Sequence, residues 1–470
     1  MSSLSSSVRP GLSGEIRTTA LLAAPLVAGH VSTGLIGFID NVLAGHHSTT
    51  TLASVTIGTA LWWLPMMIPI GTLLSVPPSV SQLDGAGRRG EIGALFRQAL
   101  WLALGLGVLL FAFLTFIPHA LAPMGMAPEI IPGARDFLHG IRWGVFALTL
   151  FFCMRYLAEG LHWTLPTMLI SAGSLLVLLP IGYVLTFGKL GFPEMGAGGL
   201  GIASAIMLWI EAIAFAVVLW KAKRFADLKL FERFDPPNWP TIRGLLATGL
   251  PIGVTVLMEG SLFIVTALLI GRLGEVPAAA HQIAINLSAL CFMIPMGLAE
   301  ATTVRVGHSL GRNDLHGVRR AAAAGYAIVL GTQLVSGIVL FSASDFLVGF
   351  YTADAAVATL AASLLLYAAA FQFPDGIQVL SAGALRGLKD TKVPMLLAAL
   401  AYWGIGMPLG AGLGLGLGWG PKGMWIGLIA GLTVASVLLC TRFVRSSHPR
   451  RIAERAARQA PQAPALQAEA

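Results

Sequence analysis

The stretch GLPIGVTVLMEGSLFIVTALLIG, residues 249–271, contains one charged side chain, Glu259, with ten residues before it and twelve after it. A largely apolar helix of this length can cross the roughly 30 Å hydrocarbon core of a bilayer. A charge at the centre of such a helix costs about 2.5 to 3.5 kcal/mol even on lenient insertion scales, so charges there usually have a function. The stretch therefore predicts a membrane-spanning helix with a functional acid at its centre.

The rest of the chain has the composition of an integral membrane protein. Of its 470 residues, 56% are hydrophobic and 11% are charged, against roughly 25% charged residues in an ordinary soluble domain. Segments that alternate in polarity, as in a membrane β-barrel, are lacking. The predicted fold class is an all-α integral membrane protein with about twelve helices, near residues 17–44, 51–80, 93–119, 129–154, 165–187, 197–220, 243–272, 279–304, 317–342, 355–381, 393–417 and 421–443.

The positions of the basic residues predict the orientation of the chain in the membrane. With successive loops placed alternately on two sides, most Lys and Arg lie on the side of both termini and of the connector 221–243. The opposite loops hold only Arg135, Lys189, Arg272 and Lys422. By the positive-inside rule, both termini are expected in the cytoplasm. The basic tail is interpreted as a solvated end, and no nucleic-acid partner is expected.

An internal repeat predicts the architecture. At an offset of 226 residues, PLVAGHVSTGLIGFIDNVLAG (25–45) aligns with PIGVTVLMEGSLFIVTALLIG (251–271), and LWWLPMMIPIG (61–71) aligns with LSALCFMIPMG (287–297). Six helices per half is an even number, so both halves enter the membrane from the same side as parallel repeats. The predicted organisation is a cytoplasmic arm (1–16), an N-lobe (17–220), a cytoplasmic linker (221–242), a C-lobe (243–444) and a cytoplasmic tail (445–470).

This two-lobed plan is typical of secondary transporters, whose substrate path runs between or within the repeats. A phosphate-binding loop of the GxxxxGK[ST] type, which would indicate ATP as the energy source, does not occur. The HExxH pair of a metal-dependent membrane enzyme is also absent. The chain is therefore expected to be a transporter and not an enzyme, without a cofactor.

Three carboxylates inside predicted helices are the main candidates for function: Asp40, Glu259 and Asp375. Asp375 lies between Pro374 and Gly376, which weaken the helical hydrogen bonds around it. Each acid has a structural alternative: Asp40 could cap or hydrogen-bond a neighbouring helix, Asp375 could be a protonated acid that satisfies the Pro-broken backbone, and Glu259 could have a merely structural role. At the 226-residue offset Asp40 aligns with Thr266 and Glu259 aligns with Thr33, so these acids are not remnants of the repeat.

A family resemblance rests on four long motifs in order along the chain. They are PLVAGHVSTGLIGFIDNVLAG (25–45), SVSQLDGAGRRGEI (79–92), AAAHQIAINLSALCFMIPMGLAEATTVRVGHSLGRND (278–314) and FPDGIQVLSAGALRGLKDT (373–391). These motifs resemble those of the multidrug and toxic compound extrusion (MATE) transporters, especially the NorM branch. The resemblance covers the chain from about residue 15 to residue 445.

The resemblance implies a V-shaped protein of the bacterial inner membrane that exports cationic, amphipathic compounds in exchange for Na⁺ or H⁺. It places Asp40 at the amino-lobe acid, a site of proton or cation linkage. It places Glu259 and Asp375 at the carboxy-lobe acids that hold the coupling cation, here Na⁺. One departure concerns the fifth helix, where Leu178 and Gly182 flank Pro180 at positions that carry Asn in NorM-like proteins.

The substrate side of the prediction is less direct. Aromatic faces attract lipophilic cations, and six aromatic residues are candidates for drug contacts: Trp62, Trp63, Phe263, Phe292, Tyr367 and Phe371. The expected partners are small cationic drugs and membrane lipids, and the expected state is a monomer. The alternative function is a flippase for lipids or lipid-linked precursors, which favours a cationic cavity; the predominance of intramembrane acids argues for drug export.

Overall fold

The computed structural model describes residues 11–452, and within this range the chain forms helices and loops. The helices are α1 (Leu12–His47), α2 (Thr49–Leu73), α3 (Val76–Gly85), α4 (Ile92–Phe116), α5 (Ile131–Ile141), α6 (Val145–Gly160), α7 (Leu165–Phe187), α8 (Gly196–Lys221), α9 (Trp239–Gly271), α10 (Glu275–Gly311), α11 (Leu315–Ser342), α12 (Ser344–Gly349), α13 (Ala355–Gly387), α14 (Lys392–Ala399), α15 (Met407–Ala411) and α16 (Gly420–Ser446). Short 3₁₀ turns are η1 (Arg89–Glu91), η2 (Ile117–Ala120), η3 (Arg142–Gly144) and η4 (Lys223–Leu228), and η5 (Leu400–Gly406) and η6 (Gly412–Gly416) are π-helical.

These helices form twelve segments that are long and apolar enough to cross a membrane, which confirms the predicted all-α fold and its number of spans. Large apolar side chains cover the outside, including Leu176, Phe116 and Leu268, which are 79%, 71% and 66% exposed. Such a surface is unfavourable in water and suits the hydrocarbon core of a bilayer. The chain is therefore a multi-pass membrane protein. Residues 1–10 of the expected arm and residues 453–470 of the expected tail lie outside the described range.

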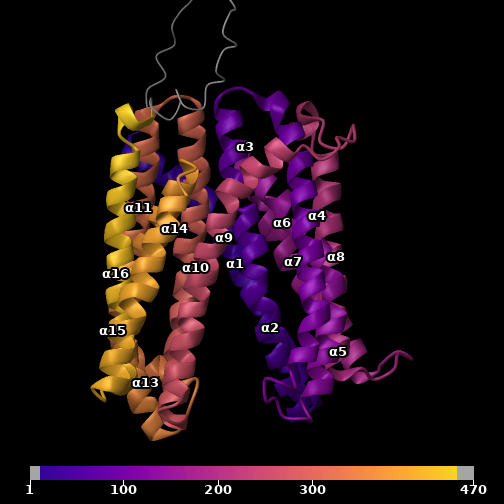
Figure 1. The fold of residues 1–470 in the computed structure, drawn as a ribbon, viewed down its shortest axis with the longest axis vertical. Coiled ribbons are helices and arrows are strands. Elements are labelled where there is room, and N and C mark those ends of the chain that lie inside the picture. The colour runs from indigo at the N-terminus through magenta and orange to yellow at the C-terminus, as the bar shows by residue number, and fades with distance from the viewer. Residues whose placement is uncertain (1–10, 453–470) are drawn as a thin grey trace, which may run out of the picture.

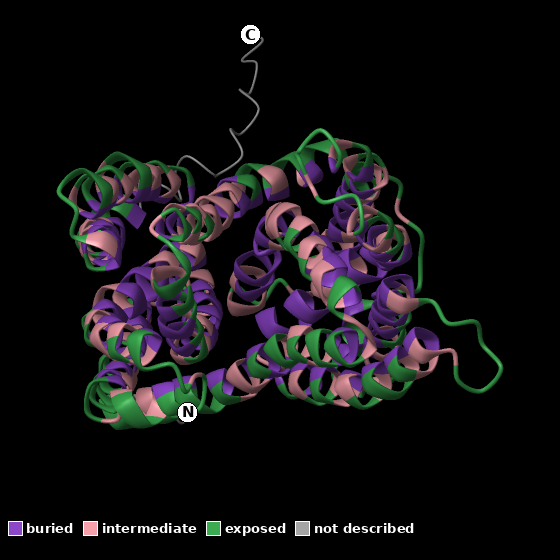
Figure 2. Cartoon of the chain, turned by 90° about the horizontal axis from the view of Figure 1, so that it is seen from below, coloured by how far each residue is buried: buried purple, intermediate pink, exposed green. Residues whose placement is uncertain are grey.

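The chain folds as two lobes, α1–α8 and α9–α16, which diverge toward one end in Figure 1. We call the opposite end, where residues 222–238 connect α8 to α9, the linker end. Figure 2, which views the molecule along its long axis, shows the helices in two groups, with exposed residues mainly on the outer surface. Residues 239–242, assigned to the linker from the sequence, belong to α9.

The first helix of each lobe crosses to the other lobe at the linker end. Near its start, α1 packs Leu22 and Leu26 into a cluster with Leu298 and Val329 of the second lobe. In the same way, the first part of α9 contributes Ile242, Leu245 and Ile252 to the core of the first lobe. This reciprocal exchange is the arrangement expected of two parallel repeats.

Glycines allow the two lobes to meet closely at related positions. A Cβ atom added to Gly71 would lie 2.5 Å from the Cα of Gly253, and one added to Gly297 would lie 2.7 Å from Val27 Cγ2. Gly297 follows Gly71 by 226 residues, and Gly253 follows Val27 by the same interval. One contact is therefore the repeat-related copy of the other, and the sequence offset corresponds to an approximate twofold relation between the lobes.

A second pair of related contacts lies closer to the linker end. A Cβ on Gly85 would collide with the backbone oxygen of His308, and a Cβ on Gly311 would collide with the backbone oxygen of Gln82. Residues 82 and 308, like 85 and 311, are 226 apart. Because each obstacle is backbone, only glycine allows this approach. The two lobes are thus in tight contact at the linker end.

Polar contacts between the lobes also hold the linker end closed. Arg305 of α10 donates to the backbone oxygen of Glu15 over 2.9 Å and also pairs with its carboxylate and with Thr19, both on α1. Gln82 of α3 donates to the backbone oxygen of Gly387 over 2.8 Å. All of these bonds join one lobe to the other.

Glycines also join the last two spans, in a way that the sequence analysis did not anticipate. Gly406 of η5 faces Gly431 of α16, and Gly414 of η6 faces Gly423 of α16. A Cβ on Gly431 would lie 2.9 Å from the Cα of Gly406. Small residues at such spacing let helix backbones approach closely in membranes. The π-helical turns accompany this close packing.

The linker is attached to the N-lobe by charged and aromatic contacts. Arg97 of α4 donates to Asp235 Oδ2 over 2.5 Å and to the backbone oxygen of Lys229 over 2.8 Å. Trp101 donates to the backbone oxygen of Asp235 over 2.9 Å. The hydrogen bond from Arg97, assisted by Arg233, holds the pKa of Asp235 below its ordinary value of 3.8.

Asp235→Asn is expected to loosen the linker, because it leaves the guanidinium of Arg97 without its charged partner. Amide hydrogen exchange across residues 223–238 should accelerate, by up to about fivefold. Because the folded protein lowers the pKa of Asp235, this attachment is complete above pH 3.8 and weakens as the pH falls through the lowered value. Exchange corrected for its intrinsic rate should then be constant from about pH 5 to pH 8.

Glu232→Gln is the matched control, since Glu232 is exposed and its only salt bridge within residues 11–452 is a 3.6 Å contact to Lys229. Equal exchange rates in the two variants would contradict the assigned role of Asp235.

Candidate functional site

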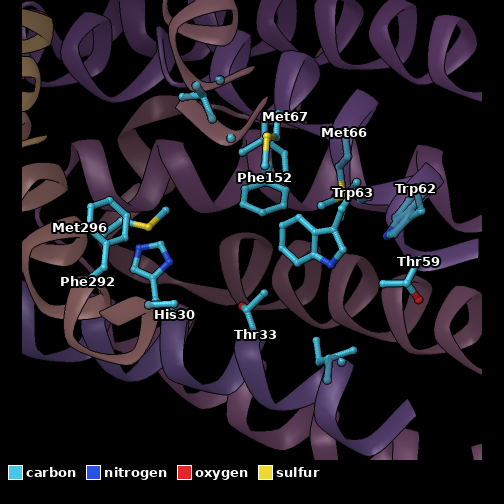
Figure 3. A pocket seen from close by; sticks show the side chains of 18 of the residues that line it. His30, Thr33, Thr59, Trp62, Trp63, Met66, Met67, Phe152, Phe292 and Met296 are labelled. Atoms are coloured by element: carbon cyan, nitrogen blue, oxygen red, sulfur yellow. The ribbon is translucent and has the colours of Figure 1, made fainter. Parts of the chain in front are cut away.

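A cavity of about 570 Å³ lies between the two lobes, lined by residues of α1, α2, α5, α6, α7 and α8 from one lobe and α9, α10 and α13 from the other. Figure 3 shows Trp63, Met66, Met67 and Phe152 along part of its wall, with His30, Phe292 and Met296 at another part. The repeat thus contributes both halves of one cavity. Its wall is mostly apolar and aromatic, with a few charged side chains.

Two of the three predicted acids lie together in the C-lobe. Glu259 of α9 and Asp375 of α13 both line the cavity. Gln378, one turn after Asp375, donates to Glu259 Oε1 over 2.6 Å and accepts from the Tyr402 hydroxyl over 2.7 Å. Asp375 is 2% exposed, and its Oδ1 has no hydrogen-bond partner in residues 11–452. The helix α13 continues through Pro374, so the acid is held by regular helix and not by a break.

This cluster has the chemistry of a site for a proton or a small hard cation. Two buried carboxylates repel each other in a medium of low dielectric constant unless a positive charge lies between them. The oxygens of Glu259, Asp375, Gln378 and Tyr402 are of the kind that Na⁺ prefers. The unpartnered Oδ1 of Asp375 is free to accept a proton or contact a cation. Among the described residues, no cluster of three or more His, Cys, Asp or Glu that could hold a metal ion occurs.

The third predicted acid, Asp40, lines the N-lobe side of the cavity and is 6% exposed. Its Oδ1 has no hydrogen-bond partner within the described range, and the Ser204 hydroxyl lies near the carboxyl group. Leu178 and Gly182, the residues at the family's Asn positions, are both buried and supply no side-chain oxygen. Glu211 of α8 also lines the cavity, close to Ser174. The N-lobe therefore has a second carboxylate that the sequence analysis did not select.

Five of the six predicted aromatic residues line the cavity: Trp62, Trp63, Phe263, Phe292 and Phe371. Trp63 is 41% exposed, whereas Phe371 is 2% exposed and packs its ring against Trp425 at 5.6 Å. Tyr367 packs at the edge of the C-lobe core and is not part of the cavity lining. Of the set, Trp63 presents the most surface to a ligand.

A buried charge network at the cavity was missed from the sequence. His30 Nε2 of α1 lies 3.0 Å from Glu300 Oε2 of α10, and Arg155 NH2 of α6 lies 3.4 Å from the same oxygen. Arg155 Nε donates to Glu159 Oε1 over 2.6 Å, and Thr167 donates to that oxygen over 3.2 Å. Each charged member lies in a span, which is the signal that selects functional candidates in membranes. Applied to every span, that rule finds Glu300 and Arg155 as readily as Glu259.

Comparison with known proteins places the chain in a family. The MatE family model matches residues 25–184 and 251–411, one segment in each repeat. A probable multidrug resistance protein NorM of Xanthomonas campestris pv. campestris is 70% identical over 443 residues, covering 94% of this chain and 97% of the relative. A protein of the same name from Xylella fastidiosa (strain 9a5c) is 61% identical over 429 residues, covering 91% and 92%.

The fold agrees with solved structures. The crystal structure of the eukaryotic MATE transporter AtDTX14 superimposes with a TM-score of 0.85 at 19% identity, covering 95% of this chain and all of that one. The family model matches one segment in each repeat, which agrees with the arrangement of two lobes around one cavity. This chain therefore belongs to the MATE family, in its NorM-like branch.

Proposed function

We propose that this chain is a secondary transporter that exports cationic, amphipathic compounds from bacteria in exchange for Na⁺ or H⁺. The observation that carries the proposal is an aromatic cavity between two lobes that contains buried carboxylates with unpartnered oxygens, on Asp40 and Asp375. The names of the relatives, which are called probable multidrug resistance proteins, also support drug export.

Charge distinguishes this proposal from lipid flipping. Five acids line the cavity: Asp40, Glu211, Glu259, Glu300 and Asp375. The basic side chains in the same lining are His30, Arg155 and Arg386. A cavity in which acids outnumber bases attracts cations and disfavours an anionic head group. Drug export therefore fits the cavity better than the transport of an anionic lipid.

Coupling follows from the cost of buried charge. When a cation or proton neutralises Glu259 and Asp375, the pair no longer repels. When a cationic drug takes over the neutralising role, the ion is released, so ion and drug compete for the same negative charge. Entry of one positive charge supplies about 2.3 kcal/mol per 100 mV of membrane potential, which is enough to concentrate a lipophilic cation outside the cell.

Alternating access supplies the movement. The lobes meet at the linker end through glycine contacts and diverge at the opposite end. The many Lys and Arg of the linker-end loops assign that end to the cytoplasm by the positive-inside rule. We accordingly assign both termini to the cytoplasm and this conformation to the outward-open state of a monomer in the bacterial inner membrane. Rocking of the lobes about the cavity would expose it to the cytoplasm.

The experiment is efflux of ethidium from proteoliposomes under an imposed Na⁺ gradient and, in separate vesicles, an imposed pH gradient. The proposal expects efflux against the ethidium gradient under at least one of them, and it expects none when both gradients are collapsed. A folded protein that moves ethidium under neither gradient, while transferring a fluorescent anionic lipid between leaflets, would overturn the proposal in favour of a flippase.

A further inference from the structure

Glu300 is the only member of the buried charge network that belongs to the C-lobe in residues 11–452. Its partners His30 and Arg155 come from α1 and α6 of the N-lobe. The side chains of His30, Glu300 and Arg155 are 9%, 8% and 2% exposed. Removing one partner from a buried charge is strongly unfavourable, because the remaining charge keeps its desolvation cost. Separation of the lobes at the linker end would leave Glu300 in that situation.

A replacement partner lies within the C-lobe. Arg386 of α13 lines the same cavity, and within residues 11–452 its guanidinium makes no hydrogen bond or ion pair. It is close enough to Glu300 and Glu259 for an electrostatic interaction with both. The helices α10 and α13, which carry Glu300 and Arg386, pack extensively against each other. Arg386 therefore stays near Glu300 when the lobes move apart.

The repeat relates Arg386 to Glu159. A Cβ on Gly160 would meet Val80 at 2.9 Å, and a Cβ on Gly387 would meet Val306 at 2.8 Å. Val80 and Val306 are 226 residues apart, so Gly160 and Gly387 occupy equivalent places. The residues just before these glycines, Glu159 and Arg386, are then equivalent positions of opposite charge.

Each lobe thus carries one arginine and one glutamate in this region: Arg155 with Glu159 in the N-lobe, and Arg386 with Glu300 in the C-lobe. Arg155 and Glu159 are already paired in this conformation. A pair formed by Arg386 and Glu300 would leave each lobe electrically balanced by itself. The lobes could then separate without leaving an isolated buried charge.

We propose that Glu300 is a positioning residue for transport that exchanges ion-pair partners between the two main conformations. In the conformation closed at the linker end it pairs with His30 and Arg155, as observed. In the conformation open at the linker end it pairs with Arg386. The idea rests on the proposed function only in requiring that this end opens and closes.

The test measures that opening without using transport. Spin labels are placed on Ala86→Cys and Arg312→Cys in a full-length chain in which Cys153, Cys291 and Cys440 are replaced by serine. Residues 86 and 312 are exposed, belong to different lobes and lie beside the glycine contacts of the linker end. Pulsed electron paramagnetic resonance in lipid nanodiscs then gives a short distance for the closed end and a long one for the open end.

The two partners of Glu300 are expected to have opposite effects. His30→Ala removes a partner only from the closed form, so the ratio of long to short distances should rise about tenfold, as for loss of a charged hydrogen bond. Arg386→Gln removes the ion-pair partner of Glu300 from the open form, whereas in the closed form it removes only an electrostatic interaction without an ion pair. Added to His30→Ala, it should reverse that rise by a similar factor, whereas Arg386→Lys, which keeps the charge, should reverse it much less.

If Arg386 has a purely structural role, the spin-label distances should follow a different pattern. If Arg386→Gln increases the long distance, or leaves the His30→Ala distribution unchanged in protein that elutes and melts like its parent, partner exchange is wrong. A single short distance in every variant is equally contrary to it. Ethidium efflux is measured separately, so a failure of drug export with opposite distance shifts would reject the proposed function and retain the exchange.

Discussion

Glu259→Gln is expected to reduce ion-driven ethidium efflux by about 5- to 150-fold, the range of a coupling free energy of 1 to 3 kcal/mol. The substitution keeps the size of the side chain and its contact to Gln378, but it removes one of the two carboxylates that the coupling ion neutralises in the proposed mechanism. Without that charge, ion binding no longer offsets the repulsion that links it to drug release. The measurement is the initial efflux rate in proteoliposomes at equal protein content.

Asp375→Asn should cause a loss of similar size, because both acids share one site around Gln378. The double variant is expected to be little worse than either single one, since residues that act as a unit are not additive. Glu275→Gln is the matched control: Glu275 is an exposed glutamate of the same lobe, at the start of α10. Normal efflux in Glu259→Gln, with a defect in Asp40→Asn alone, would instead place coupling in the N-lobe.

Gly311→Ala is expected to hold the linker end open. The added methyl group would overlap the backbone oxygen of Gln82, which no side-chain rotation can move away. Overpacking of this kind costs typically 1 to 3 kcal/mol, so the closed form should lose about 5- to 150-fold in population. Efflux should fall with it, and the distance between labels at residues 86 and 312 should lengthen. Gly85→Ala, its repeat-related counterpart, should have the same effect.

Gly331→Ala controls for the change in helix propensity. Gly331 lies within α11, and a Cβ built on it has no atom of its surroundings within 4 Å. Alanine there should favour the helix slightly and leave the distance distribution and efflux unchanged. If Gly311→Ala behaves like Gly331→Ala, the glycine contacts do not control closure, and the outward-open assignment would need another basis.

Much of the fold could be predicted from the sequence because its signals are linear. A run such as 249–271 is long and apolar enough to define a span wherever it packs, and the 226-residue offset relates the halves before any contact is known. Helix ends were predicted less closely: α10 continues to Gly311, beyond the expected end at residue 304. Arg305 and His308 are polar, but they face the other lobe and not solvent at this end.

The candidate site was predicted only in part. Asp40, Glu259 and Asp375 were selected because each is a charge amid apolar neighbours, and all three line the cavity. Tyr367 met the same aromatic criterion as Trp63, but it packs against the C-lobe core, one turn of α13 before the cavity-lining Phe371, and is not part of the lining. How far along a helix the cavity extends depends on the helices around it, so a list of aromatic residues does not tell pocket from packing.

The sequence by itself determined the twelve spans, the parallel repeat and the acids inside the membrane, because these depend on chain length, composition and a fixed offset. The tertiary structure decided which charges meet. His30 and Arg155 lie on two helices of the N-lobe, yet both contact the carboxylate of Glu300 in the C-lobe. It also decided that the linker end is closed, because glycine contacts form only at the particular tilt at which the lobes cross.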